Sequence, residues 1–160
     1  MTVRAGVLTI STSKAGGEGE DESGPRLAAF AEGIGAEVVS REVIADDRAA
    51  IEDKLCFLAD QERCDLVLTT GGTGFAPSDV TPEATLAVIE REAPGLGEAM
   101  RAASRDHTRH WMLSRAVAGI RGGTLIVNFP GSPASIDQAG EAIAGALPHA
   151  LALIAGHHPH

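Results

Sequence analysis

A glycine-rich stretch in the first half of the chain carries residue types suited to binding a phosphate or another anion. Thr70-Gly71-Gly72-Thr73-Gly74 follows a short apolar run, Leu66–Thr69. Glycines let the backbone approach an anion closely and direct N–H groups at it, and the threonine hydroxyls add donors. The stretch lacks the Gly-Lys-Ser/Thr ending of a P-loop and the Gly-x-Gly-x-x-Gly spacing of a dinucleotide-binding turn. It predicts either an anion site of another kind or a tight turn between a strand and a helix.

Carboxylates near this stretch could hold a metal ion. Asp79 lies five residues after Gly74, and Asp46 and Asp47 follow another apolar run, Ala36–Val43. Proteins commonly hold Mg²⁺ by one or two carboxylates, while substrate phosphates and waters complete its coordination. The alternative is that these acids stand at helix N-termini, where a negative charge contributes about 0.3–1 kcal/mol. Taken one by one, the acids leave both interpretations open.

The turn Pro130-Gly131-Ser132-Pro133 is a third candidate, and it is either a phosphate-facing turn or a rigid turn without a ligand. Other familiar chemistry is disfavoured. His107 and His110 have no third ligand at a suitable spacing. No Gly-x-Ser-x-Gly motif marks a serine hydrolase. Cys56 and Cys64 match no common zinc or redox spacing.

The elements that must position these residues alternate between strands and helices. Helix starts are indicated at Ser23-Gly24-Pro25, with Ser23 as the cap, at Asp46-Asp47 and at Thr81-Pro82-Glu83. The strands are predicted at Val3–Ser11, Ala36–Val43 and Leu66–Thr69, with a hairpin of Ala116–Ile120 and Thr124–Phe129. The remaining helices are predicted at Leu96–Arg105 and, as one long amphipathic helix, at Ser135–Ala155. This order predicts an α/β fold with a mostly parallel sheet covered on both faces.

In such sheets a ligand binds beyond the carboxyl ends of the strands. Three predicted loops lie there, Thr12–Glu22, Asp46–Asp47 and Thr70–Asp79, together with the turn Pro130–Pro133. We therefore expect the candidate residues to meet at one edge of the sheet.

Length and composition narrow the function classes. The 160 residues fit a single domain, 1–160, and no run is long and apolar enough for a membrane span. The net charge of −9 and the aromatic content of 3% argue against nucleic-acid binding, which needs a basic surface or stacking aromatics. We expect a cytoplasmic protein with no nucleic-acid or membrane partner.

Several motifs, in order along nearly the whole chain, resemble one known family. They are the Gly-Gly-Thr-Gly stretch, Asp79-Val80-Thr81-Pro82-Glu83-Ala84-Thr85, Pro94-Gly95-Leu96-Gly97-Glu98, the run from Ser114-Arg115 to Gly122, and Asn128-Phe129-Pro130-Gly131-Ser132-Pro133. Together they are similar to the molybdopterin adenylyltransferases, which include bacterial MogA and MoaB and the G domains of gephyrin-like proteins.

The resemblance implies a three-layer α/β/α fold and a homotrimer. It also implies a reaction, with Mg²⁺, of molybdopterin with ATP to give adenylylated molybdopterin and pyrophosphate. Molybdate insertion would follow on a partner of the MoeA type. For the trimer contact we point to Trp111 and Met112, which lie beside a polar loop.

The resemblance also implies residue roles. Asp46 and Asp79 match the family's acids and would serve catalysis and hold the metal. Thr70 to Gly74 match the loop that cradles the pterin substrate, and Pro130, Gly131 and Ser132 match a second binding turn. Ser11, at the end of the first strand, and Ser13 and Lys14, in the loop that follows it, are assigned to the nucleotide.

The chain departs from the family pattern in two binding loops. Ser78 stands where the family often has arginine, and Ser11-Thr12-Ser13 stands where it often has Ser-Asp-Arg, with Lys14 as a partial replacement for the lost cation. Two alternatives to the enzyme therefore stay open. One is a non-catalytic pterin-binding or scaffold protein, and the other is a nucleotide hydrolase like the competence-damage-inducible relatives, which usually lack the Pro82–Thr85 continuation.

Overall fold

A computed structural model describes residues 2–158 of the chain. Its strands form one six-stranded sheet in the order β2-β1-β3-β6-β5-β4. The neighbours β2, β1, β3 and β6 run parallel, whereas β5 is antiparallel to β6 and β4 is antiparallel to β5. The strand bounds are β1 Val3–Ile10, β2 Ala36–Ile44, β3 Leu66–Thr70, β4 Arg91–Glu92, β5 Ala118–Arg121 and β6 Thr124–Phe129.

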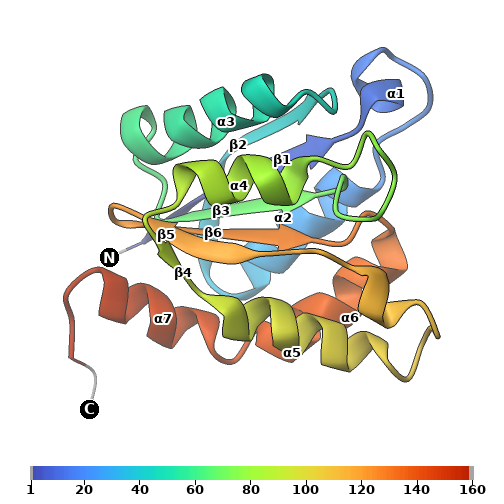
Figure 1. Ribbon diagram of the computed structural model, residues 1–160. Helices are drawn as coiled ribbons and strands as arrows, with labels where there is room; N and C mark the ends of the chain where they lie inside the picture. The colour runs from blue at the N-terminus through green and yellow to red at the C-terminus, as the bar shows by residue number, and fades with distance from the viewer. Residues whose placement is uncertain (1, 159–160) are drawn as a thin grey trace.

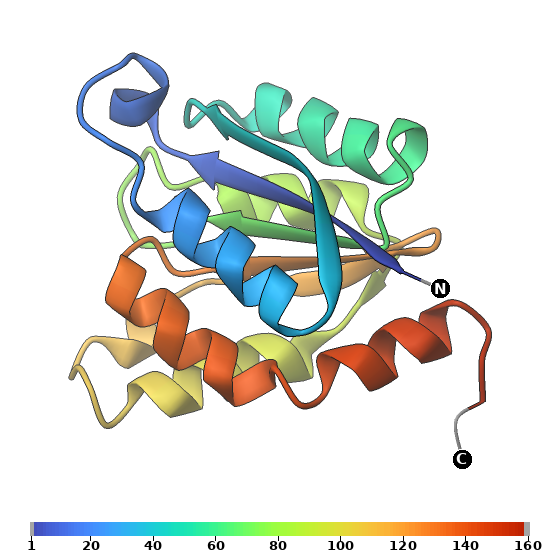
Figure 2. The same ribbon diagram turned by 180° about the vertical axis from the view of Figure 1, so that it is seen from behind.

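Helices cover both faces of the sheet, which makes three layers (Figures 1 and 2). One face carries α2 (Ser23–Gly33), α5 (Pro94–Ser104), α6 (Pro133–Ile143) and α7 (Leu147–Ile154). The other face carries α3 (Arg48–Cys56), the π-helical turn η1 (Phe57–Gln61) and α4 (Thr81–Val88). The three-layer α/β/α arrangement expected from the sequence is confirmed.

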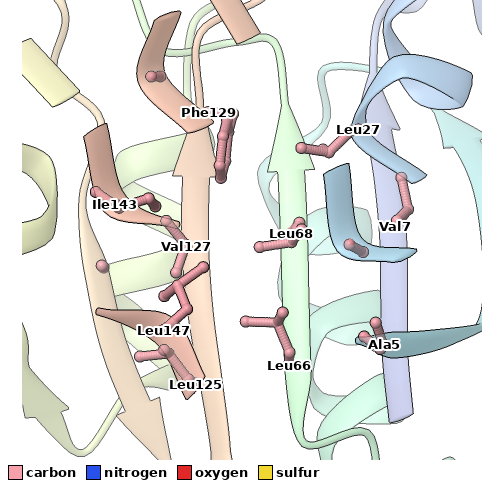
Figure 3. Packing of buried hydrophobic residues seen from close by; sticks show 14 of the residues in the cluster. Ala5, Val7, Leu27, Leu66, Leu68, Leu125, Val127, Phe129, Ile143 and Leu147 are labelled. Carbon is pink, nitrogen blue, oxygen red and sulfur yellow. The ribbon is translucent and has the colours of Figure 1, made fainter. Parts of the chain in front are cut away.

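The buried strands explain why both faces need cover. Successive side chains of a strand point to opposite faces. Leu66, Leu68 and Phe129 share a cluster with side chains of α2, α6 and α7, among them Leu27, Ile143 and Leu147 (Figure 3). Val67 and Ile126 belong to the cluster on the other face, with α3 and α4. Every residue of β3 and β6 is buried. Strands that are apolar on both faces belong at the centre of a parallel sheet.

Two predicted boundaries were wrong. The single helix Ser135–Ala155 is two helices, because the chain turns at residues 144–146. Pro148 has no N–H to donate and its ring would clash with the carbonyl four residues earlier, so it suits the first turn of a new helix and not a helix interior. The predicted loop Thr12–Glu22 begins with a four-residue helix, α1 (Thr12–Ala15), which Ser11 caps by accepting the Lys14 N–H.

The start of α2 also differs from the prediction. Ser23 is the first helical residue and does not cap the helix; its hydroxyl donates to the Gly131 carbonyl at 2.7 Å. The Gly24 N–H is instead satisfied by a carboxylate oxygen of Asp21 at 3.0 Å. The two-residue strand β4 and the 3₁₀ turn η2 (Trp111–Leu113) were not predicted, because such short elements carry no periodic signal.

Candidate functional site

The carboxyl ends of four adjacent strands meet at one edge of the sheet, and the candidate loops follow them. In the strand register, Ile10 of β1 pairs with Ile44 of β2, and Thr70 of β3 pairs with Phe129 of β6. The loops therefore begin at the same level. The Ser11 N–H donates to the Ile44 carbonyl at 2.9 Å, which ties the first two loops together.

The glycine stretch is the centre of this edge. Gly71 and Gly72 have φ angles of +96° and +70°, a backbone conformation that side chains disfavour. A Cβ on Gly71 would collide with the Ile10 carbonyl oxygen, and one on Gly72 would collide with the Thr81 hydroxyl and lie 3.1 Å from Asp46 Oδ1. Conformation and space thus both require glycine at these two positions.

Carbonyl oxygens of the glycine stretch are hydrogen-bonded within the protein, whereas several of its N–H groups are not. The Gly71 carbonyl accepts from the Thr81 hydroxyl at 3.0 Å, and the Gly72 carbonyl accepts from the Thr81 N–H at 3.1 Å. Within residues 2–158, the N–H groups of Gly72, Thr73 and Gly74 have no hydrogen-bond acceptor. This combination suits an anion cradle, because carbonyls turned inward leave donors for a ligand.

Asp46 is not the helix-start acid that the sequence left possible. Its Oδ2 atom accepts from the Thr12 N–H at 3.0 Å and from the Thr12 hydroxyl at 2.9 Å. Asp47 caps α3 instead, by accepting the Ala49 N–H at 3.1 Å. The Oδ1 atom of Asp46 lies beside Gly72. Asp46 therefore does not cap α3, and it stands at the glycine stretch.

Asp79 reaches the same stretch from its far end. Its Oδ2 atom accepts the Ala76 N–H at 3.0 Å and lies 2.8 Å from the position that a Cβ on Gly74 would take. The residue preceding α4 is Val80, and no side chain caps that helix. The helix starts where Thr81-Pro82-Glu83 predicted, but Thr81 is its first residue and not its cap, and the Thr81 hydroxyl donates to the Gly71 carbonyl.

The second turn lies against the glycine stretch. The Thr70 hydroxyl donates to the Pro130 carbonyl at 2.7 Å, and a Cβ on Gly131 would lie 3.5 Å from Gly71 Cα. Ser132 caps α6 by accepting the Ser135 N–H at 3.2 Å. The turn is thus part of the same edge, and Ser132 also caps a helix.

Of the residues assigned to the nucleotide, Ser13 and Lys14 lie on α1 and Ser11 caps it, next to the Thr12–Asp46 contact. Ser11 and Ser13 have their hydroxyl oxygens 3.3 Å apart, and Lys14 is half-buried. Among the described residues, Lys14 forms no ion pair. Its cation is therefore available to a bound anion.

A buried polar cluster supports the site from beneath. The Asn128 side-chain amide donates to the hydroxyls of Thr69 at 3.1 Å and Thr85 at 3.0 Å, and its oxygen accepts the Val117 N–H at 3.2 Å. The Thr85 hydroxyl donates to the Thr81 carbonyl at 2.9 Å. These bonds join β3, β6 and α4 where the glycine stretch begins.

Sequence reasoning missed two residues that hold the loops. Asp21 accepts from the Thr9 hydroxyl at 2.9 Å as well as from the Gly24 N–H. Arg115 donates to two carbonyls of the 74–79 segment and to Glu83. Hydrogen bonding from Arg115 holds the pKa of Glu83 below its usual range. Arg115 is part of the motif that runs from Ser114 to Gly122. Its partners are distant in sequence, so no local sequence pattern indicated these contacts.

A metal ion at this edge would need ligands from a bound substrate as well as from the protein. No three His, Cys, Asp or Glu side chains in residues 2–158 are placed to hold a metal by themselves, and this includes His107 and His110. Asp46 and Asp79 flank the glycine stretch as a pair of carboxylates. That donor set fits Mg²⁺, which proteins bind through one or two carboxylates together with substrate phosphates.

The fold and the edge together define an α/β protein whose glycine-rich and acidic loops meet at the carboxyl ends of its parallel strands, where ligands of such sheets bind. A family model described as a probable molybdopterin binding domain matches residues 6–149. The chain belongs to this family.

Named relatives and solved structures agree with that assignment. The molybdopterin adenylyltransferase of Helicobacter pylori is 41% identical over 168 residues, covering 99% of this chain and 91% of that protein. The molybdopterin adenylyltransferase of Escherichia coli is 45% identical over 145 residues, covering 89% and 74%. A crystal structure of the molybdopterin biosynthesis enzyme MoaB from Thermus thermophilus superimposes with a TM-score of 0.91 at 44% identity, covering 97% and 98%.

The described part of the chain contains no helix long and apolar enough to cross a membrane.

Proposed function

We propose that this protein is a molybdopterin adenylyltransferase of molybdenum cofactor biosynthesis. It transfers the adenylyl group of ATP to the terminal phosphate of molybdopterin and releases pyrophosphate. The observation that carries the proposal is the meeting of unbonded N–H groups in Gly72–Gly74 with the carboxylates of Asp46 and Asp79 at one edge of the sheet. The similarity to enzymes named for this activity supports it.

The reaction brings two polyanions together, so the site must offset their repulsion. A molybdopterin phosphate oxygen bonds to the α-phosphorus of ATP while the bond from that phosphorus to pyrophosphate breaks. The N–H groups of residues 72–74 bind the pterin phosphate, and the turn 130–132 closes the other side of that subsite. Fixed donors of this kind stabilise charge that develops during transfer.

The nucleotide is assigned to α1 and the loop that follows it. Ser11 and Ser13 present hydroxyls and Lys14 presents a cation to the ATP phosphates. Asp46 and Asp79 would hold Mg²⁺, which would neutralise phosphate charge when bound. Thr12 holds the Asp46 carboxylate by two hydrogen bonds, so this residue, a departure from the family pattern, contributes to the site.

The binding-only alternative rests on Ser78. The exposed loop that carries Asp79 contains no cation between Gly74 and Asp79, because serine stands at position 78. A protein that binds molybdopterin without adenylylating it would retain the glycine stretch and need no such cation.

Assembly and location are part of the same proposal. We expect a homotrimer, with the exposed side chain of Met112 near the contact, and a cytoplasmic protein that passes its product to a MoeA-type insertase. A groove of about 600 Å³ along α5, α6 and α7 is lined by apolar residues such as Leu96 and Ile154 and offers a second surface for that contact. Residues 1–160 are proposed as one ligand-binding domain.

The test is direct. The purified protein is mixed with molybdopterin, Mg²⁺ and ATP, and adenylylated molybdopterin is measured by chromatography and mass spectrometry. Product at a rate proportional to protein supports the enzyme. Binding of molybdopterin without product selects the binding protein, and loss of ATP without adenylylated pterin selects the hydrolase.

A further inference from the structure

Arg115 contacts both ends of the exposed loop that carries Asp79. The residue lies between η2 and β5, and its guanidinium Nε donates to the Gly74 carbonyl at 2.8 Å while Nη2 donates to the Asp79 carbonyl at 2.7 Å. Its backbone N–H donates to the Thr73 carbonyl at 2.8 Å. One residue therefore fixes the segment where it leaves the glycine stretch and where it returns to α4.

The loop between these two points has little else to hold it. Residues 75–78 are exposed, and the Phe75 side chain is 67% exposed. The bonds formed by Asp79 within the loop, from Ala76 N–H to its carboxylate and from its own N–H to the Ala76 carbonyl, stay inside the segment. They shape the loop but do not attach it to the sheet. Attachment depends on Arg115.

Glu83 sets the direction of the guanidinium. Nη1 of Arg115 donates to Glu83 Oε2 at 2.6 Å, and Nη2 reaches Oε1 at 3.3 Å. Glu83 stands in the first turn of α4 and so offers a fixed platform. The pair also neutralises the arginine, since its charge faces a carboxylate and its other donors face carbonyls. With these donors in use, the guanidinium has no pair of adjacent N–H groups left to bind a substrate phosphate in a bidentate way.

We infer that Arg115 is a positioning residue, which sets the place of Asp79 and of the Gly74 end of the anion cradle without touching the substrate. The inference deepens the proposed function, on which its kinetic consequence rests. A lysine cannot reproduce the contact, because one ammonium group cannot bond in the three directions that the planar guanidinium serves.

Arg121 provides a matched control. It too forms a fork on a carboxylate, from Nε and Nη2 to Asp60 at 3.1 and 2.8 Å, and it too donates to a main-chain carbonyl, that of Val88, at 2.9 Å. It lies at the end of β5, and its partners are η1 and the end of α4. Replacing Arg121 therefore removes hydrogen bonds of the same kind, none of which involves the loop that carries Asp79.

The first measurement is amide hydrogen exchange on the ligand-free, full-length protein, and it does not depend on any activity. Arg115→Lys should speed exchange in residues 74–80 by about tenfold or more, while β1 and β6 stay protected, because only the local opening becomes easier. Arg121→Lys should leave that segment unchanged. Equal exchange in the parent and Arg115→Lys would overturn the inference.

The second measurement is steady-state kinetics. Arg115→Lys should lower kcat by about 10–100-fold, because a small misplacement of a catalytic group has that scale of effect. The KM for molybdopterin should rise by less than kcat falls, because the Gly72 and Thr73 N–H groups lie outside the loosened segment 74–80. Glu83→Gln, which keeps the hydrogen-bonding shape, should give a smaller loss of kcat in the same direction. A large rise in KM with unchanged exchange would show that Arg115 binds substrate directly, contrary to the inference. If the parent makes no product, the proposed function fails, whereas the exchange result still decides the role of Arg115.

Discussion

Thr12 and Asp46 hold each other by three hydrogen bonds across the two loops that follow β1 and β2. The Thr12 N–H and hydroxyl donate to Asp46 Oδ2 at 3.0 and 2.9 Å, and the Asp46 N–H donates to the Thr12 hydroxyl oxygen at 3.0 Å. The Thr12 hydroxyl is both donor and acceptor in this pair. Its removal breaks two of the three bonds and leaves the carboxylate less well oriented.

Thr12→Val should therefore weaken metal use more than it weakens the fold. The Mg²⁺ concentration that gives half-maximal adenylylation should rise by about tenfold, the scale seen when a residue that orients a metal ligand is lost. The pair is exposed, so the free energy of unfolding should fall by no more than about 1 kcal/mol. Thr12→Ser keeps the hydroxyl and is the control. A valine variant with the Mg²⁺ dependence of the parent would show that this pair does not orient a metal ligand.

Asp79→Asn should separate catalysis from binding. Asparagine can still accept the Ala76 N–H through its amide oxygen, so thermal stability should change little. Losing the charge should cost on the order of 10²–10³ in rate. Molybdopterin affinity, measured by fluorescence or calorimetry, should stay close to that of the parent because the cradle donates from the backbone.

The matched control for this change is Asp47→Asn. Asp47 caps α3, and asparagine caps a helix about as well as aspartate. Its rate should equal that of the parent. Parent-like product formation by Asp79→Asn would remove Asp79 from the catalytic assignment.

Gly72→Ala should weaken molybdopterin binding, since its Cβ would collide with the Thr81 hydroxyl and approach Asp46 Oδ1. The left-handed backbone at Gly72 adds about 1–2 kcal/mol of strain. Gly33→Ala is the control, because its Cβ would meet nothing within 4 Å inside helix α2. Binding titrations on both variants, with unfolding curves to confirm folding, test this. Equal affinity in Gly72→Ala and Gly33→Ala would place the cradle elsewhere.

The two thiols should differ in reactivity. Burial raises the pKa of the Cys64 thiol from 9.0 to about 11, and its side chain is 2% exposed. Burial also raises the pKa of the Cys56 thiol, which is only partly covered. A thiol reagent near pH 8 should modify Cys56 first and Cys64 only on unfolding, because the thiolate is the reactive form. Mass spectrometry of the labelled peptides gives the order, and faster labelling of Cys64 would contradict it.

The same pKa difference predicts a pH dependence of stability. Below about pH 9 the Cys64 thiol is protonated in the folded and the unfolded chain, so it contributes no pH dependence. Between pH 9.0 and about 11 only the unfolded chain loses this proton, which lowers the free energy of unfolding. Urea unfolding across this range should show a steeper loss of stability in the parent than in Cys64→Ala. Parallel curves would contradict the prediction.

A trimer should be seen by light scattering at micromolar concentration. Met112 is 59% exposed and apolar, so Met112→Lys should reduce the trimer fraction if this surface lies in the contact. Phe57→Lys changes another exposed apolar side chain, beside α3, and serves as the control. A monomer mass for the parent would remove the assembly from the proposed function.

Much of this site was predictable because its residues are local in sequence. A glycine stretch after a buried strand, followed by Asp79, is visible in one short segment, and parallel strands bring such loops to one edge. The contacts of Arg115 and Asp21 were not visible, because each depends on where distant loops meet in the folded chain. The roles of Asp46 and Asp47 could not be separated either, since the choice between them depends on Thr12, which is 34 residues away from Asp46.

The order of strands in the sheet has a consequence for synthesis on the ribosome. The centre of the sheet pairs β3, complete at Thr70, with β6, which begins at Thr124. Until β6 emerges, the nascent chain presents the unpaired backbone of β3, flanked by apolar side chains, as an open edge that favours aggregation. Chains that stop before Thr124 should therefore need chaperones or be degraded. The proposed anion cradle, which includes the turn 130–132, is complete only after Ser132 has been translated, later than every strand of the sheet.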